Sequence, residues 1–317
     1  MSRMKATWPL AGIMVLAAGF MFVFSGASRP PASHQEEEED AAEERLTLEE
    51  WTPRPAAARG RKIYERYCGG CHGPEGLGDG EAASLLSPRP RNFQKGKFKF
   101  RSTLPGQLPM EEDLLRTVTC GLPGSSMPAF RLVPEPERRD VVAWVLHLAI
   151  FGKAVEEVSI LMEDEELSME EVVRDRLPEI RARLEKEHLD GRVVVPVPPP
   201  PPKTPELLAH ARERFDRECA KCHGPTGRGE GNSAYALRDW KDSEIVPRDF
   251  TTGVFRSGSS PRDLYLRLKT GLNGTPMPAT SGTPEELWGF VYLILDMKDS
   301  SRKVKGNRAC DAPEEGR

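Results

Sequence analysis

The sequence contains the pattern Cys-x-x-Cys-His twice, and this pattern limits what the chain can fold into more than any other feature. The first copy occupies residues 68–72 (CGGCH) and the second occupies residues 219–223 (CAKCH). Each copy places two thiols three positions apart and an imidazole directly after the second thiol. This order of side chains is the attachment pattern of haem c. A chain with two such patterns is expected to fold around two haems.

The spacing has a chemical reason. Two thiols must reach the two vinyl groups of one porphyrin to form thioethers, and the next His can then bind the iron axially. We therefore expect two haems c per chain. The cysteines that would bind them covalently are Cys68, Cys71, Cys219 and Cys222, and the axial imidazoles are His72 and His223. A structural disulfide, a thioredoxin-like pair and a four-Cys zinc site are alternatives, but none explains a His after both pairs.

The two patterns lie in two similar stretches of sequence, which we call the first repeat (residues 55–152) and the second repeat (residues 204–300). A small residue and an aromatic residue precede each motif, as Gly60 and Tyr64 and as Ala211 and Phe215. Three further segments then recur in the same order: PRNF (90–93) and PRDF (247–250), FRS (100–102) and FRS (255–257), GLPGSSMPA (121–129) and GLNGTPMPA (271–279).

The last of these segments aligns Met127 with Met277. A six-coordinate haem iron needs a ligand opposite the His, and a soft, neutral thioether suits reduced iron and raises its potential. Gly and Pro around each Met favour a rigid loop that could hold the sulfur in place. The alternative is that both methionines fill the core. Their equivalent positions favour axial ligands.

Each repeat is expected to be mainly helical. Helices are predicted to enter each motif over residues 58–67 and 205–218, and to precede each Met over residues 111–119 and 261–270. A last helix in each repeat begins near Pro136 and Pro284, since Pro is favoured in a first turn. It carries apolar residues at helical spacing.

With these motifs in place, the sequence resembles the class I c-type cytochromes over both repeats. The resemblance implies two tandem cytochrome c domains, 55–152 and 204–300, and one-electron transfer without bond chemistry on a substrate. It also implies that the first helix crosses the last closely near Gly60 and Ala211, and that a loop carbonyl orients Nδ1 of each His. Arg91 and Arg248 could pair with haem propionates, or could be solvated surface residues.

The N-terminus has a different composition. Arg3 and Lys5 precede 17 apolar residues, 8–24, which as a helix would span about 25 Å. Residues 1–28 are expected to be a membrane anchor, with the alternative of a signal peptide cleaved after the small residues 25–27. Both interpretations place the haem domains on the periplasmic or extracytoplasmic side.

The remaining segments are expected to be connectors. Residues 29–54 form an acidic, flexible spacer, residues 153–203 a linker with exposed amphipathic helices and then a proline-rich rod, and residues 301–317 a tail. Cys120 and Cys310 lie outside the motifs, and the sequence leaves open whether they pair or remain free thiols.

These features predict a membrane-associated electron carrier in a respiratory chain rather than an enzyme. Donors and acceptors would be redox proteins, such as a quinol-oxidising complex and an oxidase or reductase. A di-haem enzyme such as a peroxidase, or a redox or gas sensor, is the alternative, but each needs an open iron site. The net charge of -4 and the absence of a basic cluster argue against nucleic acid as a partner.

Overall fold

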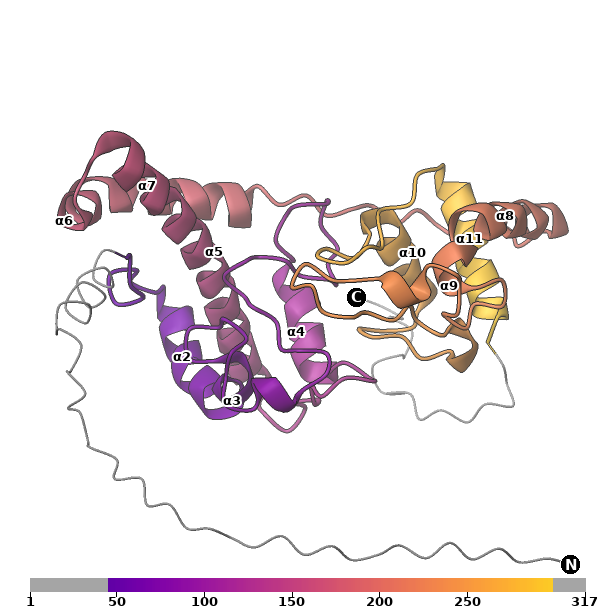
Figure 1. The fold of residues 1–317 in the computed structure, drawn as a ribbon, viewed down its shortest axis with the longest axis horizontal. Helices are drawn as coiled ribbons and strands as arrows, with labels where there is room; N and C mark the ends of the chain where they lie inside the picture. The colour runs from indigo at the N-terminus through magenta and orange to yellow at the C-terminus, as the bar shows by residue number, and fades with distance from the viewer. Residues whose placement is uncertain (1–44, 299–317) are drawn as a thin grey trace, which may run out of the picture. The chain divides into compact units, whose positions relative to one another are not determined.

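The computed structural model describes residues 45–298, which fold into helices joined by long loops (Figure 1). Within this range the only β structure is two isolated bridges, Thr103 with Val194 and Arg238 with Glu244. The expected mainly helical fold is therefore confirmed for the described residues. No helix between residues 45 and 298 is long and apolar enough to cross a bilayer. The expected anchor (1–28), the tail and Cys310 lie outside the described range.

Four helices build the first repeat: α2 (Pro55–Tyr67), α3 (Gly69–His72), α4 (Glu111–Cys120) and α5 (Glu135–Glu165), with a short 3-10 turn η2 (Ala83–Leu85). Prolines occupy the first turns of α2 and α5, where their missing N–H groups cost nothing. Asp113 in the first turn of α4 accepts from the amide of Met110 at 3.0 Å, so its carboxylate caps the helix. All predicted helices of this repeat are present.

The second repeat has the same order of helices: α8 (Pro205–Glu218), α9 (Ala220–His223), α10 (Pro261–Thr270) and α11 (Pro284–Asp296), with 3-10 turns η5 (Ala234–Ala236) and η6 (Phe250–Thr252). Each of α8, α10 and α11 begins with proline and is capped by the side-chain oxygen of the preceding residue, Thr204, Ser260 or Thr283. The helices predicted from the sequence of this repeat are confirmed.

The first and last helices of each repeat cross closely, as the family resemblance implied. A Cβ added to Gly60 of α2 would lie 1.9 Å from the carbonyl oxygen of Asp140 in α5. In the second repeat, the Cβ of Ala211 lies 3.2 Å from the position that a Cβ on Gly289 would take. A small residue is therefore required on at least one helix at each crossing.

The region after the first repeat differs from the expected exposed linker. Helix α5 continues to Glu165, and a chain of short helices follows: α6 (Met169–Glu171), the π-helix η3 (Val172–Arg176), α7 (Leu177–Glu185) and the π-helix η4 (Lys186–Asp190). Their apolar residues Val172, Leu177, Ile180 and Leu184 are buried in the core of the first repeat. Apolar residues at helical spacing need a covering partner, and α5 beyond residue 152 supplies one.

Residues 46–51 also differ from the flexible spacer expected over 29–54. Leu46, Leu48 and Trp51 are at most 6% exposed and belong to the same core as α5 and α7. The ring centroid of Trp51 lies 6.4 Å from that of Phe151. This short segment therefore closes one side of the helical layer that α5 and α7 form.

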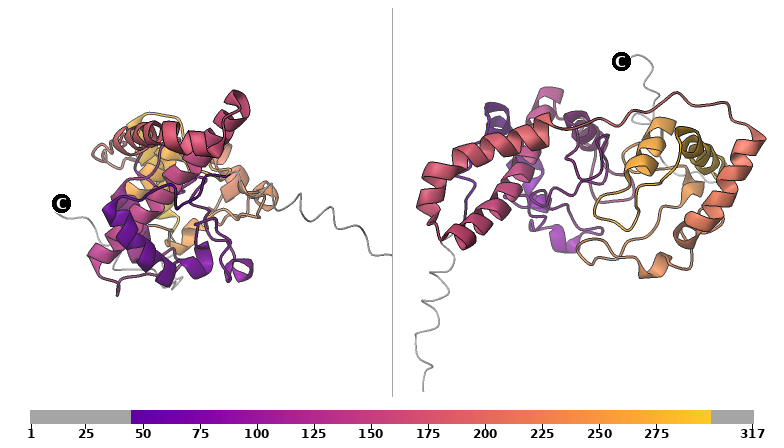
Figure 2. Two further views of the ribbon diagram at one scale, coloured as in Figure 1. Left: turned by 90° about the vertical axis from the view of Figure 1, so that its left-hand side faces the viewer. Right: turned by 90° about the horizontal axis from the view of Figure 1, so that it is seen from above.

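The proline-rich segment is bound to both repeats instead of standing free. The carbonyls of Pro198 and Pro201 accept hydrogen bonds from Trp288 Nε1 (3.1 Å) and the Tyr292 hydroxyl (2.5 Å) of α11. Upstream, the amide of Val195 donates to the carbonyl of Ser102 in the first repeat at 2.7 Å. A polyproline helix has no internal hydrogen bonds, so its carbonyls are free to accept these. Figure 2 shows the segment running from η4 to α8.

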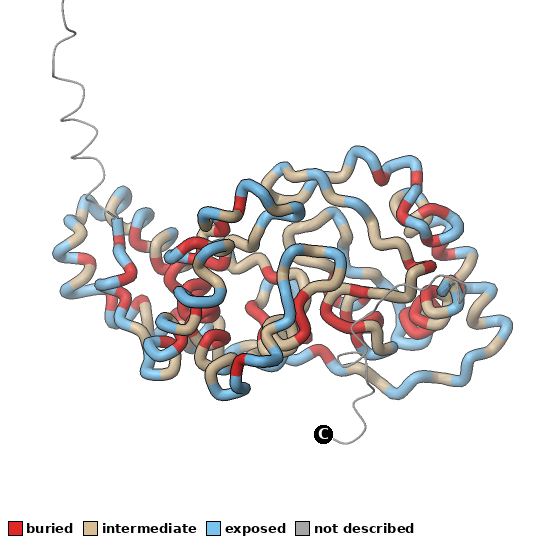
Figure 3. Tube along the Cα trace, turned by 90° about the horizontal axis from the view of Figure 1, so that it is seen from below, coloured by how far each residue is buried: buried red, intermediate tan, exposed pale blue. Residues whose placement is uncertain are grey.

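The buried apolar residues form two clusters, one in the first repeat with the segments packed on it and one in the second repeat. Figure 3 shows how buried positions are distributed along the chain. The first core centres on α5 and includes Tyr64 and Trp144, and the second centres on α11 and includes Phe215 and Phe290. All described residues nevertheless belong to one compact unit, because the two repeats contact each other directly. Those contacts involve the loops that carry the predicted haem ligands.

Candidate functional site

The first attachment motif forms a tight helical turn at the end of α2. The amide of Cys68 donates to the carbonyl of Tyr64 at 2.7 Å, and the amide of His72 donates to the carbonyl of Cys68 at 2.9 Å. Gly73 then ends the turn with a φ of 78°, where a Cβ would lie 2.0 Å from a carboxylate oxygen of Asp79. The turn holds both thiols and the imidazole on a few adjacent residues.

His72 is fixed by a backbone carbonyl of the recurring Pro-Arg-x-Phe segment. Its Nδ1 lies 3.0 Å from the oxygen of Arg91, and its ring stacks on Phe93 with centroids 4.5 Å apart. A proton on Nδ1 donates to that carbonyl, which leaves Nε2 with its lone pair available for a metal. Burial lowers the pKa of His72, which favours the neutral imidazole that such ligation requires.

The second motif repeats this arrangement. His223 Nδ1 lies 3.4 Å from the carbonyl oxygen of Arg248, and its ring stacks on Phe250 with centroids 4.5 Å apart. Burial likewise lowers the pKa of His223. The sequence predicted a carbonyl partner without naming it. The structure identifies the arginine of Pro-Arg-x-Phe in both repeats as the residue whose carbonyl lies beside the imidazole.

The thiols of the motifs are partly buried and free. Burial raises the pKa of Cys68 to about 12 and that of Cys219 to about 11, so these two thiols are protonated near neutral pH. All four motif cysteines are free, so neither pair forms the structural disulfide considered above. Cys120, at the end of α4, is disulfide-bonded, which answers the question left open for this residue.

Both predicted methionine ligands lie in loops of the same geometry. The amide of Leu122 donates to the carbonyl of Met127 at 3.1 Å, and that of Leu272 donates to Met277 at 3.0 Å. Each loop starts at a glycine with a φ of 64°, Gly121 or Gly271. A Cβ there would lie 2.6 Å from the backbone of the loop's own Met-Pro-Ala segment. Met127 and Met277 are half-buried. Their role as iron ligands stays a prediction.

Five cations lie partly buried near the two motifs: Arg91, Lys99, Lys241, Arg248 and Arg256. Burial lowers the pKa of each, and that of Lys99 falls to about 8 through burial and then the charge of Arg91. Desolvated cations favour a nearby anion. Arg91 and Arg248 are therefore suited to pair with haem propionates, which remains a prediction.

The residues of both sites fit covalently bound haem. In each site two thiols and a neutral imidazole occupy one turn, and a thioether follows in a rigid loop. In the first site the charges of Arg91 and Lys241 also act on His72. This donor set is suited to iron in a propionate-bearing macrocycle rather than to a hard cation.

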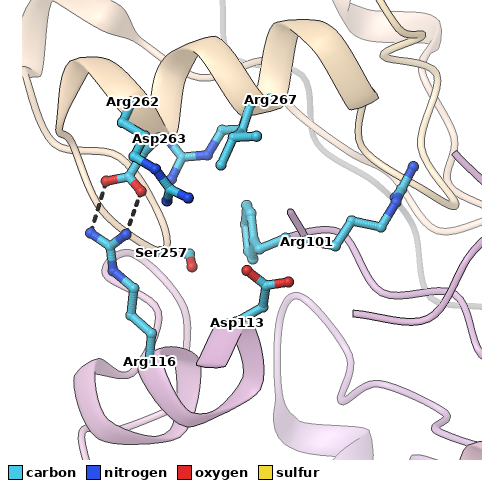
Figure 4. A pocket seen from close by; sticks show the side chains of 9 residues that line it. Arg101, Asp113, Arg116, Ser257, Arg262, Asp263 and Arg267 are labelled. Atoms are coloured by element: carbon cyan, nitrogen blue, oxygen red, sulfur yellow. Dashed lines mark hydrogen bonds and ion pairs between the residues drawn. The ribbon is translucent and has the colours of Figure 1, made fainter. Parts of the chain in front are cut away.

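Two cavities lie away from the motifs. The smaller, of about 40 Å³, lies where α4 of the first repeat faces α10 of the second (Figure 4). The guanidinium of Arg116 there donates twice to the carboxylate of Asp263, once at 2.8 Å from Nη2. The larger, of about 240 Å³, lies among α2, α4, α5, α7 and η4, and no motif cysteine lines it. The Arg116–Asp263 pair is a contact between the repeats that sequence reasoning missed, because ion pairs between distant residues leave no periodic pattern.

Comparisons with known proteins support a cytochrome c domain in the first repeat. The family profile described as cytochrome c oxidase, cbb3-type, subunit III matches residues 55–145. A solved chain of the reducing HAO-like protein complex from Kuenenia stuttgartiensis is 33% identical, with a TM-score of 0.61. The alignment covers 78% of this chain and 98% of that one. No curated protein matches the sequence.

Proposed function

The chain belongs to the same family of c-type cytochromes as the Kuenenia stuttgartiensis chain, and we propose that it binds two haems c and transfers electrons one at a time. The observation that carries the proposal is the repeated site. In both repeats a Cys-x-x-Cys-His turn presents a His whose Nδ1 faces the carbonyl of the Pro-Arg-x-Phe arginine. One such site would be a single-haem cytochrome, whereas the second repeat supplies an equivalent set.

In this proposal Cys68 and Cys71 hold the first haem, and Cys219 and Cys222 hold the second. Bound haem supplies an iron that changes its charge by one electron. The chain positions His72 and His223 through the carbonyls of Arg91 and Arg248, and it holds Met127 and Met277 in hydrogen-bonded loops. With Met127 and Met277 as ligands, neither iron would have an open site, which is the reason to favour a carrier over an enzyme.

We also propose the cellular setting. Haem c attachment and the apolar N-terminal segment together suggest an exported protein, anchored by residues 8–24 or released after cleavage, in a respiratory chain. The similar Kuenenia stuttgartiensis chain is part of an HAO-like complex. By analogy, this chain would pass electrons to or from a larger redox protein. It would then need no substrate of its own.

Haem counting on the full chain tests the proposal. A pyridine haemochrome assay should give two haems c per chain, and mass spectrometry should show two covalent additions. Cys68→Ala with Cys71→Ala, and separately Cys219→Ala with Cys222→Ala, should each leave one. A haem count below two in the wild type would contradict the di-haem proposal.

The oxidised spectrum separates the carrier from the alternatives. A carrier with Met127 and Met277 as ligands should show low-spin haem and the far-red band of Met-ligated iron. A high-spin haem in the resting protein would instead indicate an open iron, as a peroxidase or a gas sensor requires.

A further inference from the structure

The loop that carries Met127 is contacted by an arginine of the opposite repeat. We call residues 121–129 the first Met loop and residues 271–279 the second. Nη2 of Arg256 donates to the carbonyl of Gly124 in the first Met loop at 2.6 Å. The backbone of Arg256 is held in turn, because Nη2 of Arg267 donates to its carbonyl at 2.6 Å. A cation of the second repeat therefore fixes the turn that precedes Met127.

The reverse contact reaches the residue directly before the second Met loop. Nη2 of Arg101 donates at 2.9 Å to the carbonyl of Thr270, the last residue of α10 and the one from which the second Met loop starts. Arg101 is 6% exposed and also donates to the carbonyls of Phe98 and Leu104. Its guanidinium therefore joins the backbones of the two repeats inside the protein.

These two arginines occupy the same place in the recurring Phe-Arg-Ser segment. Arg101 stands at the position of Arg256, yet each contacts the Met loop region of the other repeat and not its own. A charged donor to a carbonyl is among the stronger hydrogen bonds in proteins. The two contacts thus run in opposite directions between the repeats, and each joins residues more than a hundred positions apart.

The surrounding contact keeps both arginines in reach. The Arg116–Asp263 pair joins α4 to α10, and Asp263 is 6% exposed (Figure 4). Next to the second Met loop, the amide of Trp240 donates to the carbonyl of Gly274 at 3.2 Å, and Nζ of Lys97 lies 5.2 Å from the Trp240 ring. Lys97 of the first repeat therefore contacts the residue that bonds to the second Met loop.

We propose that Arg256 and Arg101 are positioning residues that hold the Met loop of the opposite repeat, so that methionine ligation in each repeat depends on the other. The proposal rests on the proposed function, in which Met127 and Met277 are axial ligands. Neither arginine touches the sulfur. Each acts through the backbone, by restricting the loop that presents it.

The test uses the far-red band of Met-ligated iron in the oxidised full chain, with one methionine replaced to isolate the other. In Met277→His the remaining band reports the first Met loop. Adding Arg256→Gln should remove most of it, whereas adding Arg101→Gln should leave it. In Met127→His the dependence should reverse. Arg256→Lys retains a donor and should restore much of the first band.

Amide hydrogen exchange gives a second readout that does not depend on the iron. Arg256→Gln should speed exchange at the Leu122 amide, which closes the first Met loop, roughly tenfold, and leave the Leu272 amide unchanged. A far-red band and Leu122 exchange that both survive Arg256→Gln would overturn the crossed dependence while leaving the di-haem carrier intact. A wild type without the band would overturn both proposals.

Discussion

The hydroxyl of Tyr64 donates to the carbonyl of Gly73 over 2.8 Å, and this bond ties α2 to the residue that follows His72. Tyr64 is fully buried, with its ring centroid 6.3 Å from that of Phe93, on which His72 stacks. Burial raises the pKa of Tyr64 far above its usual range, so the phenol stays protonated and remains a donor. The second repeat has Phe215 here and lacks the bond.

Removing this hydroxyl should cost little. We expect Tyr64→Phe to lower the free energy of unfolding by about 1 kcal/mol, the net value of a typical buried hydrogen bond. The Gly73 carbonyl keeps a bond from the Gly76 amide, which limits the loss. Denaturant titration measures it, with the more exposed Tyr67→Phe as control. A loss above 3 kcal/mol would show that the phenol does more than bond to Gly73.

Enlarging the residue at the helix crossing should cost more. Gly60→Ala would place a Cβ 1.9 Å from the Asp140 carbonyl and force α2 away from α5. Overpacking of this kind costs about 3 kcal/mol. The reverse change in the second repeat, Ala211→Gly, should cost only about 1 kcal/mol, since it creates no clash. Equal effects of the two variants on thermal unfolding would contradict the crossing argument.

The segment before α2 is expected to be a structural part of the first repeat. Trp51 is 1% exposed, and the guanidinium carbon of Arg181 lies 5.4 Å from its ring centroid. Trp51→Ala should therefore lower the free energy of unfolding by about 3–5 kcal/mol. Replacing Tyr235, which is 82% exposed, should have almost no effect. An equally small change in the free energy of unfolding for the Trp51 and Tyr235 variants would show that residues 46–51 act only as a spacer.

The sequence was informative where function depends on residues close together in the chain. The Cys-x-x-Cys-His turns, the Met loops and the helices around them follow from spacing and composition, because one helical turn or one loop brings the groups together. For the partner of each His Nδ1, the sequence predicted a loop carbonyl but not the residue that supplies it. Arg91 lies nineteen positions from His72, and the irregular loop between them fixes no distance from sequence alone.

Contacts between distant segments could not be predicted in this way. The charged stretch after residue 152 has the pattern of a solvated amphipathic helix, yet Val172 and Leu184 are buried against α5. Five prolines favour a rod, but the pattern does not reveal that Trp288 would bond to the Pro198 carbonyl. Arg101 and Arg256 were visible as a repeat, and only the fold shows that each crosses to the other repeat.

A buried imidazole away from the haem sites should make stability depend on pH. His147 of α5 is 8% exposed, stacks on Trp144 with centroids 5.0 Å apart, and faces Arg61 of α2 and Arg181 and Glu185 of α7. Burial, reinforced by Arg181, lowers its pKa to about 4 from 6.5. Between these values the unfolded chain binds a proton that the folded chain does not.

The free energy of unfolding should therefore be constant near neutral pH for this group and fall as the pH drops from 6.5 toward 4. The loss would reach roughly 3 kcal/mol. His147→Leu introduces the residue found at the matching position 295 and should flatten this part of the curve. His210→Leu, at a half-exposed site, serves as control. Denaturant titrations from pH 7 to 4 measure the slope, and an equal slope in His147→Leu and the wild type would assign the acid sensitivity to other groups.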